Sequence, residues 1–257
     1  MPPEPAALAG VLIVGALYAR GVATLWRRAG REHVVRGWQT LCFGGGLLAI
    51  VVALESPLDR LGEELFAFHM AQHLLLILVA GPLLVLGAPV APLLWALPEA
   101  SRRTVGAWLR TAAAFLTRAP VAFGAHSLAL WLWHVPALYE AALRNRGVHI
   151  FEHVSFLATA VLFWWVIVHA TRAVALLCVF GLALQSTLLG ALLAFSPTPW
   201  YTAHAVTAPA WGLTAGEDQQ LAGLIMWVPG SSLYLAAALG LLAAWFRDSS
   251  KASASSS

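Results

Sequence analysis

Two pairs of histidines have the residue type and the spacing that a metal site requires. His69 and His73 lie in "HMAQH", and His149 and His153 lie in "HIFEH". Residues i and i+4 of an α-helix lie on the same face, so each pair presents two imidazole rings in one direction. Each pair also begins a long apolar stretch, where a polar side chain is costly unless it has a partner. We therefore predict a metal site built between two helices.

Further candidate ligands follow from the expected direction of each helix. His134 in "LWLWHVPALYEAAL" falls in the same half of the molecule as the two pairs. The additional candidates, either as ligands or as groups that orient the imidazole rings, are Met70, Glu152, Asp218, Met226 and His204. Five histidines are too many for one ion, so either two nearby sites exist or some rings orient others. No HExxH motif is present, and we predict no catalytic residues.

The residue types favour copper but leave alternatives open. Imidazole binds zinc, copper, iron and nickel, whereas thioether sulfur favours Cu(I), so Met70 and Met226 point to copper. A haem held by His73 together with His134 or His153 is a less favoured alternative. A third possibility is a metal-free protein in which the histidines form a hydrogen-bonded network or a proton pathway.

The composition is that of a membrane protein. The chain has 257 residues, of which 60% are hydrophobic and 11% are charged, and its mean hydropathy is +0.77. Soluble domains are about 25% charged, and a membrane-spanning helix needs roughly 20 apolar residues. The apolar stretches lack the alternation of a membrane β-barrel, so we expect an all-α bundle. Seven spans are predicted: Ala6–Trp26, Trp38–Leu54, Phe66–Leu86, Val121–Leu143, Ile150–His169, Ala173–Phe195 and Leu221–Phe246.

The basic residues predict the orientation of these spans. Twelve of the fifteen Lys and Arg residues follow spans one, three and five or lie in the C-terminal tail. Because basic loops stay in the cytoplasm, we expect the N-terminus outside and the C-terminus inside. The histidine pairs then lie at the outer face. The net charge of +3 is too small and too dispersed to indicate nucleic-acid binding, and "MPPEPAA" lacks the basic segment of a cleavable signal peptide.

The chain is predicted to form one membrane domain, residues 1–248, followed by a disordered polar tail, residues 249–257. Two further features are expected to shape the outer face. Pro136, which closely follows His134, is expected to bend the fourth span. The segment Ser196–Gln220, rich in Pro and Trp, is expected to cover the outer helix ends as a lid.

Several motifs occur together in a characteristic order. They are "SPLD" at 56–59, "HMAQHLLL" at 69–76, "GPLLVLGAP" at 81–89, "LWLWHVPALYEAAL" at 130–143, "VHIFEHVSFL" at 148–157 and "EDQQLAGLIMWVPG" at 217–230. This ordered set resembles the multi-pass CtaG family, bacterial assembly factors of caa-type cytochrome c oxidases. The resemblance covers roughly residues 55–246.

The resemblance implies a non-enzymatic role in the bacterial cytoplasmic membrane, where the protein would help to insert copper into the oxidase. It implies the oxidase subunits, a copper donor protein and the lipid bilayer as partners, and no nucleic acid.

Overall fold

Helices account for all regular secondary structure in residues 5–255, the part of the chain that the computed structural model describes. The α-helices are α1 (Pro5–Ala29), α2 (Gly37–Glu55), α3 (Pro57–Glu64), α4 (Phe66–Leu74), α5 (Gly81–Leu86), α6 (Val90–Trp95), α7 (Glu99–Leu116), α8 (Ala119–Trp133), α9 (Pro136–Arg144), α10 (Arg146–His169), α11 (Arg172–Phe195) and α12 (Ala215–Ser255). A π-helix, η1 (Leu75–Ala80), joins α4 to α5, and two 3₁₀ turns, η2 (Ala203–Ala205) and η3 (Ala208–Trp211), precede α12.

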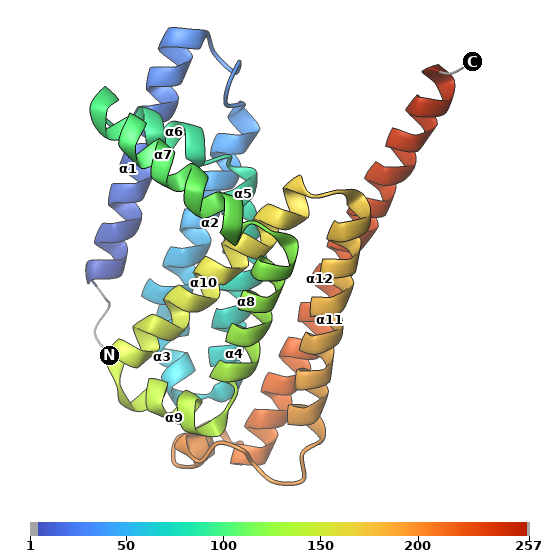
Figure 1. Ribbon diagram of the computed structural model, residues 1–257. Coiled ribbons are helices and arrows are strands. Elements are labelled where there is room, and N and C mark those ends of the chain that lie inside the picture. Colours follow the sequence, from blue (N-terminus) through green and yellow to red (C-terminus); the bar gives the residue numbers. More distant parts are fainter. Residues whose placement is uncertain (1–4, 256–257) are drawn as a thin grey trace.

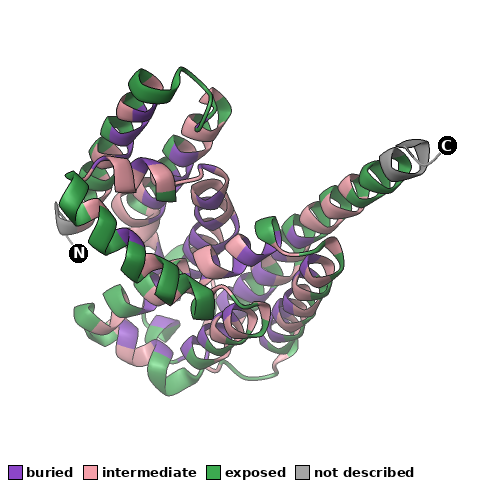
Figure 2. Cartoon of the chain, turned by 45° about the horizontal axis from the view of Figure 1, so that its top comes forward, coloured by how far each residue is buried: buried purple, intermediate pink, exposed green. Residues whose placement is uncertain are grey.

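Six helical segments of the described chain are long and apolar enough to cross a membrane, and a seventh is added if one bent pair counts as a single span. Their surfaces agree with this assignment, because large apolar side chains such as Leu41, Leu177 and Phe180 are about 70% exposed. Exposing large apolar side chains costs free energy in water but not in lipid. Figure 2 shows exposed residues along the outer sides of the helices and buried residues concentrated inside the bundle.

The fourth predicted span, Val121–Leu143, is not one straight helix. It is divided into α8 and α9, which meet at an angle of 76°. Pro136 begins α9, and the preceding Val135 has an extended conformation with ψ of 125°. A residue before proline is driven out of the helical region, and proline cannot donate the backbone hydrogen bond that would continue α8. The bend expected at Pro136 therefore breaks the span, and His134 lies at the break.

The third span, Phe66–Leu86, is continuous but changes its winding at η1. Pro82 lies just after this π-helical segment and has no N–H to donate to the carbonyl of Ile77, five residues earlier. The indole N–H of Trp164 on α10 donates to that carbonyl at 2.8 Å. The hydrogen bond therefore fixes the third span against α10. These two spans carry the histidine pairs.

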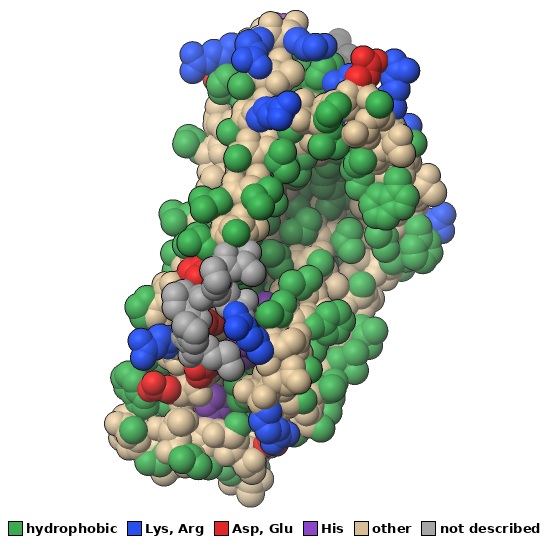
Figure 3. All heavy atoms as spheres, turned by 90° about the vertical axis from the view of Figure 1, so that its left-hand side faces the viewer, with side chains coloured by type: hydrophobic (Ala, Val, Ile, Leu, Met, Phe, Trp, Pro, Cys, Tyr) green, Lys and Arg blue, Asp and Glu red, His purple; other side chains and the backbone are tan. Residues whose placement is uncertain are grey.

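Figure 1 shows the helices running alternately up and down in one bundle. The connections α1–α2 and α10–α11, together with the C-terminal end of α12, lie at one end. The helices α3 and α9 and the segment 196–214 lie at the other. Lys and Arg side chains gather at the first end, above a hollowed and largely hydrophobic face (Figure 3). The bundle thus has two chemically different ends, as the charge distribution predicts.

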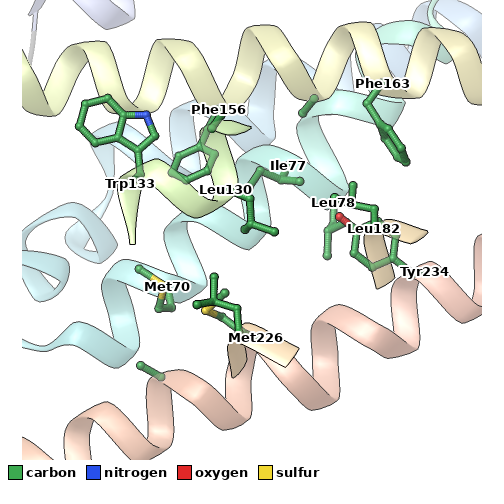
Figure 4. Packing of buried hydrophobic residues seen from close by; sticks show 14 of the residues in the cluster. Met70, Ile77, Leu78, Leu130, Trp133, Phe156, Phe163, Leu182, Met226 and Tyr234 are labelled. Atoms are coloured by element: carbon green, nitrogen blue, oxygen red, sulfur yellow. The ribbon is translucent and has the colours of Figure 1, made fainter. Parts of the chain in front are cut away.

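Close helix packing holds α12 in position against α11 and α4. A Cβ atom added at Gly223 would lie 2.6 Å from the backbone nitrogen of Ala194, so only glycine permits this approach. Buried side chains from α4, η1, α8, α10, α11 and α12 form the main core (Figure 4).

The segment predicted to be a disordered tail begins at Ser249, within α12. Helix α12 continues past Ser249 to Ser255, and the hydroxyls of Ser249 and Ser250 donate to carbonyls one turn earlier. A hydrogen bond from a serine hydroxyl to the carbonyl one turn earlier is compatible with a helical backbone. Residues 1–4 of the predicted domain and residues 256–257 of the tail lie outside the described chain.

Candidate metal site

The backbones of α4 and α10 are held by specific polar caps. The carboxylate of Asp218, at the start of α12, accepts hydrogen bonds from the backbone N–H groups of Phe66 at 2.7 Å and Ala67 at 3.0 Å. It thereby satisfies two of the free donors at the N-terminus of α4 and complements the helix dipole. At the start of α10, the side chain of Asn145 accepts from the N–H groups of Gly147 and Val148. Both histidine pairs therefore lie in the first turns of helices whose ends are fixed.

Four side chains from α4 and α10 converge on one point. His69, His149, Glu152 and His153 each place one ligand atom within 4.8 Å of those of the others. Glu152 is fully buried, His69 and His153 are nearly so, and His149 is half-buried. Three imidazoles and one carboxylate, close together and shielded from water, are donors for a transition-metal ion.

The polar atoms of this cluster lack hydrogen-bond partners within the described chain. These atoms are both carboxylate oxygens of Glu152 and the Nε2 atoms of His69, His149 and His153. Buried polar groups are normally hydrogen-bonded, because an unpaired one costs about 1–3 kcal/mol. Five unpaired atoms that face one another could all serve as ligands of one cation.

His73 lies beside this cluster rather than in it. Its Nε2 is 3.7 Å from Oε1 of Glu152, and the Nε2 of His69 is 3.7 Å from the other carboxylate oxygen. Both ring nitrogens of His73 are buried without a hydrogen-bond partner in the described chain. Glu152 is thus shared between the two histidines of α4.

His134 and the two methionines occupy a neighbouring position. The Nε2 of His134 lies 3.4 Å from the Sδ of Met70, and both side chains are buried. Met226 on α12 lines the same small cavity. The predicted ligand set is therefore divided in space between a histidine–glutamate cluster and a histidine–methionine group.

The segment 196–214 closes the end of the bundle that holds the site. Tyr201 and His204 of this segment are buried, and the phenol of Tyr201 donates to the carbonyl of His134 at 2.9 Å. The Nε2 of His204 lies 2.7 Å from the hydroxyl of Tyr139. Burial lowers the pKa of His204 below its ordinary value and raises the pKa of Tyr201. Both groups are thus kept neutral near pH 7.

The predicted site residues fall into different positions. His69, His149, Glu152 and His153 come together, whereas Asp218 caps α4 and His204 holds the segment above the cluster. Two residues outside the predicted set, Tyr139 on α9 and Tyr201 in the segment itself, connect this segment to the site. Buried tyrosine hydroxyls usually find a hydrogen-bond partner, which is the signal that these two residues carried.

The histidines do not fit a haem. The ring centroids of His73 and His153 are 5.3 Å apart and nearly perpendicular, so the two rings touch edge to face. The cavity that His73 shares with His134 has a volume of about 20 Å³. Pockets for organic ligands have volumes of about 300 Å³ or more, so neither pair, as its rings lie in this structure, leaves room for a porphyrin between them.

A family comparison agrees with the motif order. The model of the family described as cytochrome c oxidase caa3 assembly factor (Caa3_CtaG) matches residues 16–248. The chain belongs to this family. The match includes both helices that carry the histidine cluster, and the family is described as one of assembly factors.

The curated relatives of this family member are longer proteins. Uncharacterized proteins of Mycobacterium bovis and Mycobacterium tuberculosis are each 32% identical over 168 residues, which is 62% of this chain and 24% of theirs. An uncharacterized protein of Mycobacterium leprae is 27% identical over 267 residues, which is 93% of this chain and 38% of the relative. The chain thus spans well under half the length of these relatives. No solved structure matches it.

Proposed function

We propose that this assembly factor binds copper at His69, His149, Glu152 and His153, and that it aids the delivery of copper to cytochrome c oxidase. The observation that carries the proposal is the buried convergence of three imidazoles and one carboxylate, all with unpaired ligand atoms. Family membership supplies the client, because the family is one of oxidase assembly factors. The nearby thioethers of Met70 and Met226 favour copper over zinc.

The location of the cluster suits transfer rather than permanent storage. The half-buried His149 lies closest to solvent, whereas His69, Glu152 and His153 are buried. An ion can therefore reach the first ligand from the aqueous end and then exchange its remaining water for protein donors. The protein would act in the bacterial cytoplasmic membrane, receive copper from a donor protein and contact an oxidase subunit.

A metal-free scaffold is the second candidate. The 3.7 Å contacts of Glu152 with His69 and His73 favour it, because these buried groups lie close enough together to belong to one polar network without a metal. In that case the histidines would stabilise the bundle, and their replacement would weaken folding without affecting any metal.

The experiment compares two sets of histidine variants in cells that depend on this chain for oxidase maturation. The double variant His149→Ala/His153→Ala removes two ligands, whereas His169→Ala removes an exposed histidine at the opposite end of the same helix, α10. We expect the double variant to lose bound copper and oxidase activity at normal protein levels, and the control to keep both. Normal oxidase activity and copper content in the double variant would overturn the proposal.

A further inference from the structure

His134 and Met70 make a contact that ordinary hydrogen bonding does not explain. The Nδ1 of His134 lies 2.6 Å from the carbonyl oxygen of Leu130, which can only accept, so Nδ1 carries the ring proton. In the neutral ring, Nε2 then has a lone pair, and it lies 3.4 Å from the Sδ of Met70, which has no hydrogen. Two buried electron-pair donors therefore face each other.

A small enclosed cavity adjoins this contact. Its volume is about 20 Å³, and Met70, His73, His134 and Met226 all line it. A cavity of roughly 10–15 Å³ already holds one water-sized particle. Figure 4 shows the side chains of Met70 on α4 and Met226 on α12 directed toward each other across the helix interface. Both methionines are almost fully buried.

The donor set defines the chemistry of this cavity. Thioether and imidazole are ligands that Cu(I) accepts, because soft thioether sulfur favours the soft Cu(I) ion. Metal–nitrogen and metal–sulfur bonds of about 2.0 and 2.3 Å at a tetrahedral angle separate the two donor atoms by about 3.5 Å. The observed 3.4 Å between Nε2 and Sδ is close to this separation.

We propose that Met70, His134 and Met226 form a second metal site, selective for Cu(I), beside the histidine–glutamate cluster. The inference rests on the proposed function for its biological use, since both sites would handle the same cargo. The two sites differ in their donors: the first contains a carboxylate, whereas the second has only one imidazole and two thioethers.

His73 connects the two sites. Its ring lines the cavity, and its Nε2 is 3.7 Å from the carboxylate of Glu152 in the first cluster. Neither ring nitrogen has a hydrogen-bond partner in the described chain, so the ring is available as a ligand on either side. A Cu(I) ion can therefore pass between the sites by ligand exchange at His73, without a change of oxidation state.

The test uses the purified full chain in detergent under anaerobic conditions, with Cu(I) titrated against a chromophoric Cu(I) chelator. The variant Met70→Leu/Met226→Leu replaces both thioethers by side chains of similar volume and so preserves the packing. The control, Ile77→Leu, changes an apolar residue that lines the same cavity. We expect the double variant to bind one equivalent of Cu(I) fewer, or at least about tenfold more weakly at that site, and the control to bind as the parent does.

A second measurement does not depend on the variants. Among the residues whose side chains are described, only Met70 and Met226 are methionines. After selenomethionine labelling, X-ray absorption at the selenium edge should show a copper atom next to selenium when Cu(I) is bound. When Zn(II) is added instead, selenium should have no metal neighbour. Unchanged Cu(I) binding in the double methionine variant, or a selenium spectrum without a copper neighbour, would overturn the second site.

The two proposals fail in different ways. If the His149→Ala/His153→Ala variant loses copper and oxidase maturation while the methionine variant binds normally, only the second site is wrong. If the methionine site binds Cu(I) but the oxidase matures normally in every variant, the proposed function is wrong and the second site stands.

Discussion

At the scale of single residues, Glu152 is the most informative side chain. It is fully buried, both oxygens lack hydrogen-bond partners in the described chain, and four imidazole rings lie around it. A carboxylate in such surroundings is expensive unless a cation accompanies it. Glu152 should therefore destabilise the metal-free protein and stabilise the metal-bound one.

The variant Glu152→Gln separates these effects. We expect copper affinity to fall by about 10–100-fold, because the only anionic donor is lost. The thermal unfolding temperature of the metal-free protein should stay the same or rise, because an uncompensated buried carboxylate is removed. Chelator competition and calorimetry of the metal-free protein measure the two quantities, and Glu99→Gln, an exposed surface site, is the control. A variant with parental affinity and a lower unfolding temperature would indicate a purely structural carboxylate.

At the scale of helices and loops, local sequence patterns predicted much of the fold. Apolar length located the spans, and i, i+4 spacing placed each histidine pair on one face. Contacts between distant segments were beyond such patterns. Examples are the cap of α4 by Asp218, 152 residues from Phe66, and the hydrogen bond from Trp164 to Ile77. The sequence also could not predict that His134 and the methionines lie apart from the main cluster, because their separation depends on how α4, α8 and α12 pack.

The packing of α12 against α11 gives a direct test at this scale. A Cβ at Gly223 would lie 2.6 Å from Ala194 N and from Gly190 O, so Gly223→Ala must separate the two helices. We expect a loss of about 1–3 kcal/mol in the free energy of unfolding. On the same helix, a Cβ at Gly240 meets nothing within 4 Å, so Gly240→Ala should be neutral or stabilising by up to about 1 kcal/mol. Equal unfolding temperatures for the two variants would contradict this packing.

The segment 196–214 should loosen in acid because of His204. Burial lowers the pKa of His204 in the folded protein, whereas the unfolded chain titrates near about 6.5. Between these two values the unfolded state binds more protons, so the contribution to stability is complete above about 6.5 and declines as the pH falls below it. We expect faster protease cleavage of this segment at pH 5 than at pH 7.5.

The matched variant for this prediction is His204→Gln, which keeps a polar group near Tyr139 but does not titrate. Its cleavage rate should change less between the two pH values than that of the parent. An identical pH response in the parent and the variant would assign the effect to another group.

At the scale of the whole molecule, the basic end and the histidine-bearing end are opposite (Figures 1 and 3). The positive-inside rule then predicts that the segment 196–214 faces the outside and that the C-terminal end of α12 faces the cytoplasm. A reporter that is active only in the cytoplasm should be active when fused after Phe246 and inactive when inserted after Thr202. The reverse pattern would place the histidine cluster on the cytoplasmic side and remove the outer face as the route of copper entry.

A copper titration of the purified chain tests most directly whether the buried histidine–glutamate cluster binds copper. The parent and His169→Ala should bind copper with the same affinity, and X-ray absorption at the copper edge should show imidazole ligands. The variant His149→Ala/His153→Ala should lose that ion and reduce the imidazole signal. If the parent binds no copper, or if the double variant binds it with unchanged affinity and an unchanged spectrum, the cluster is not a copper site.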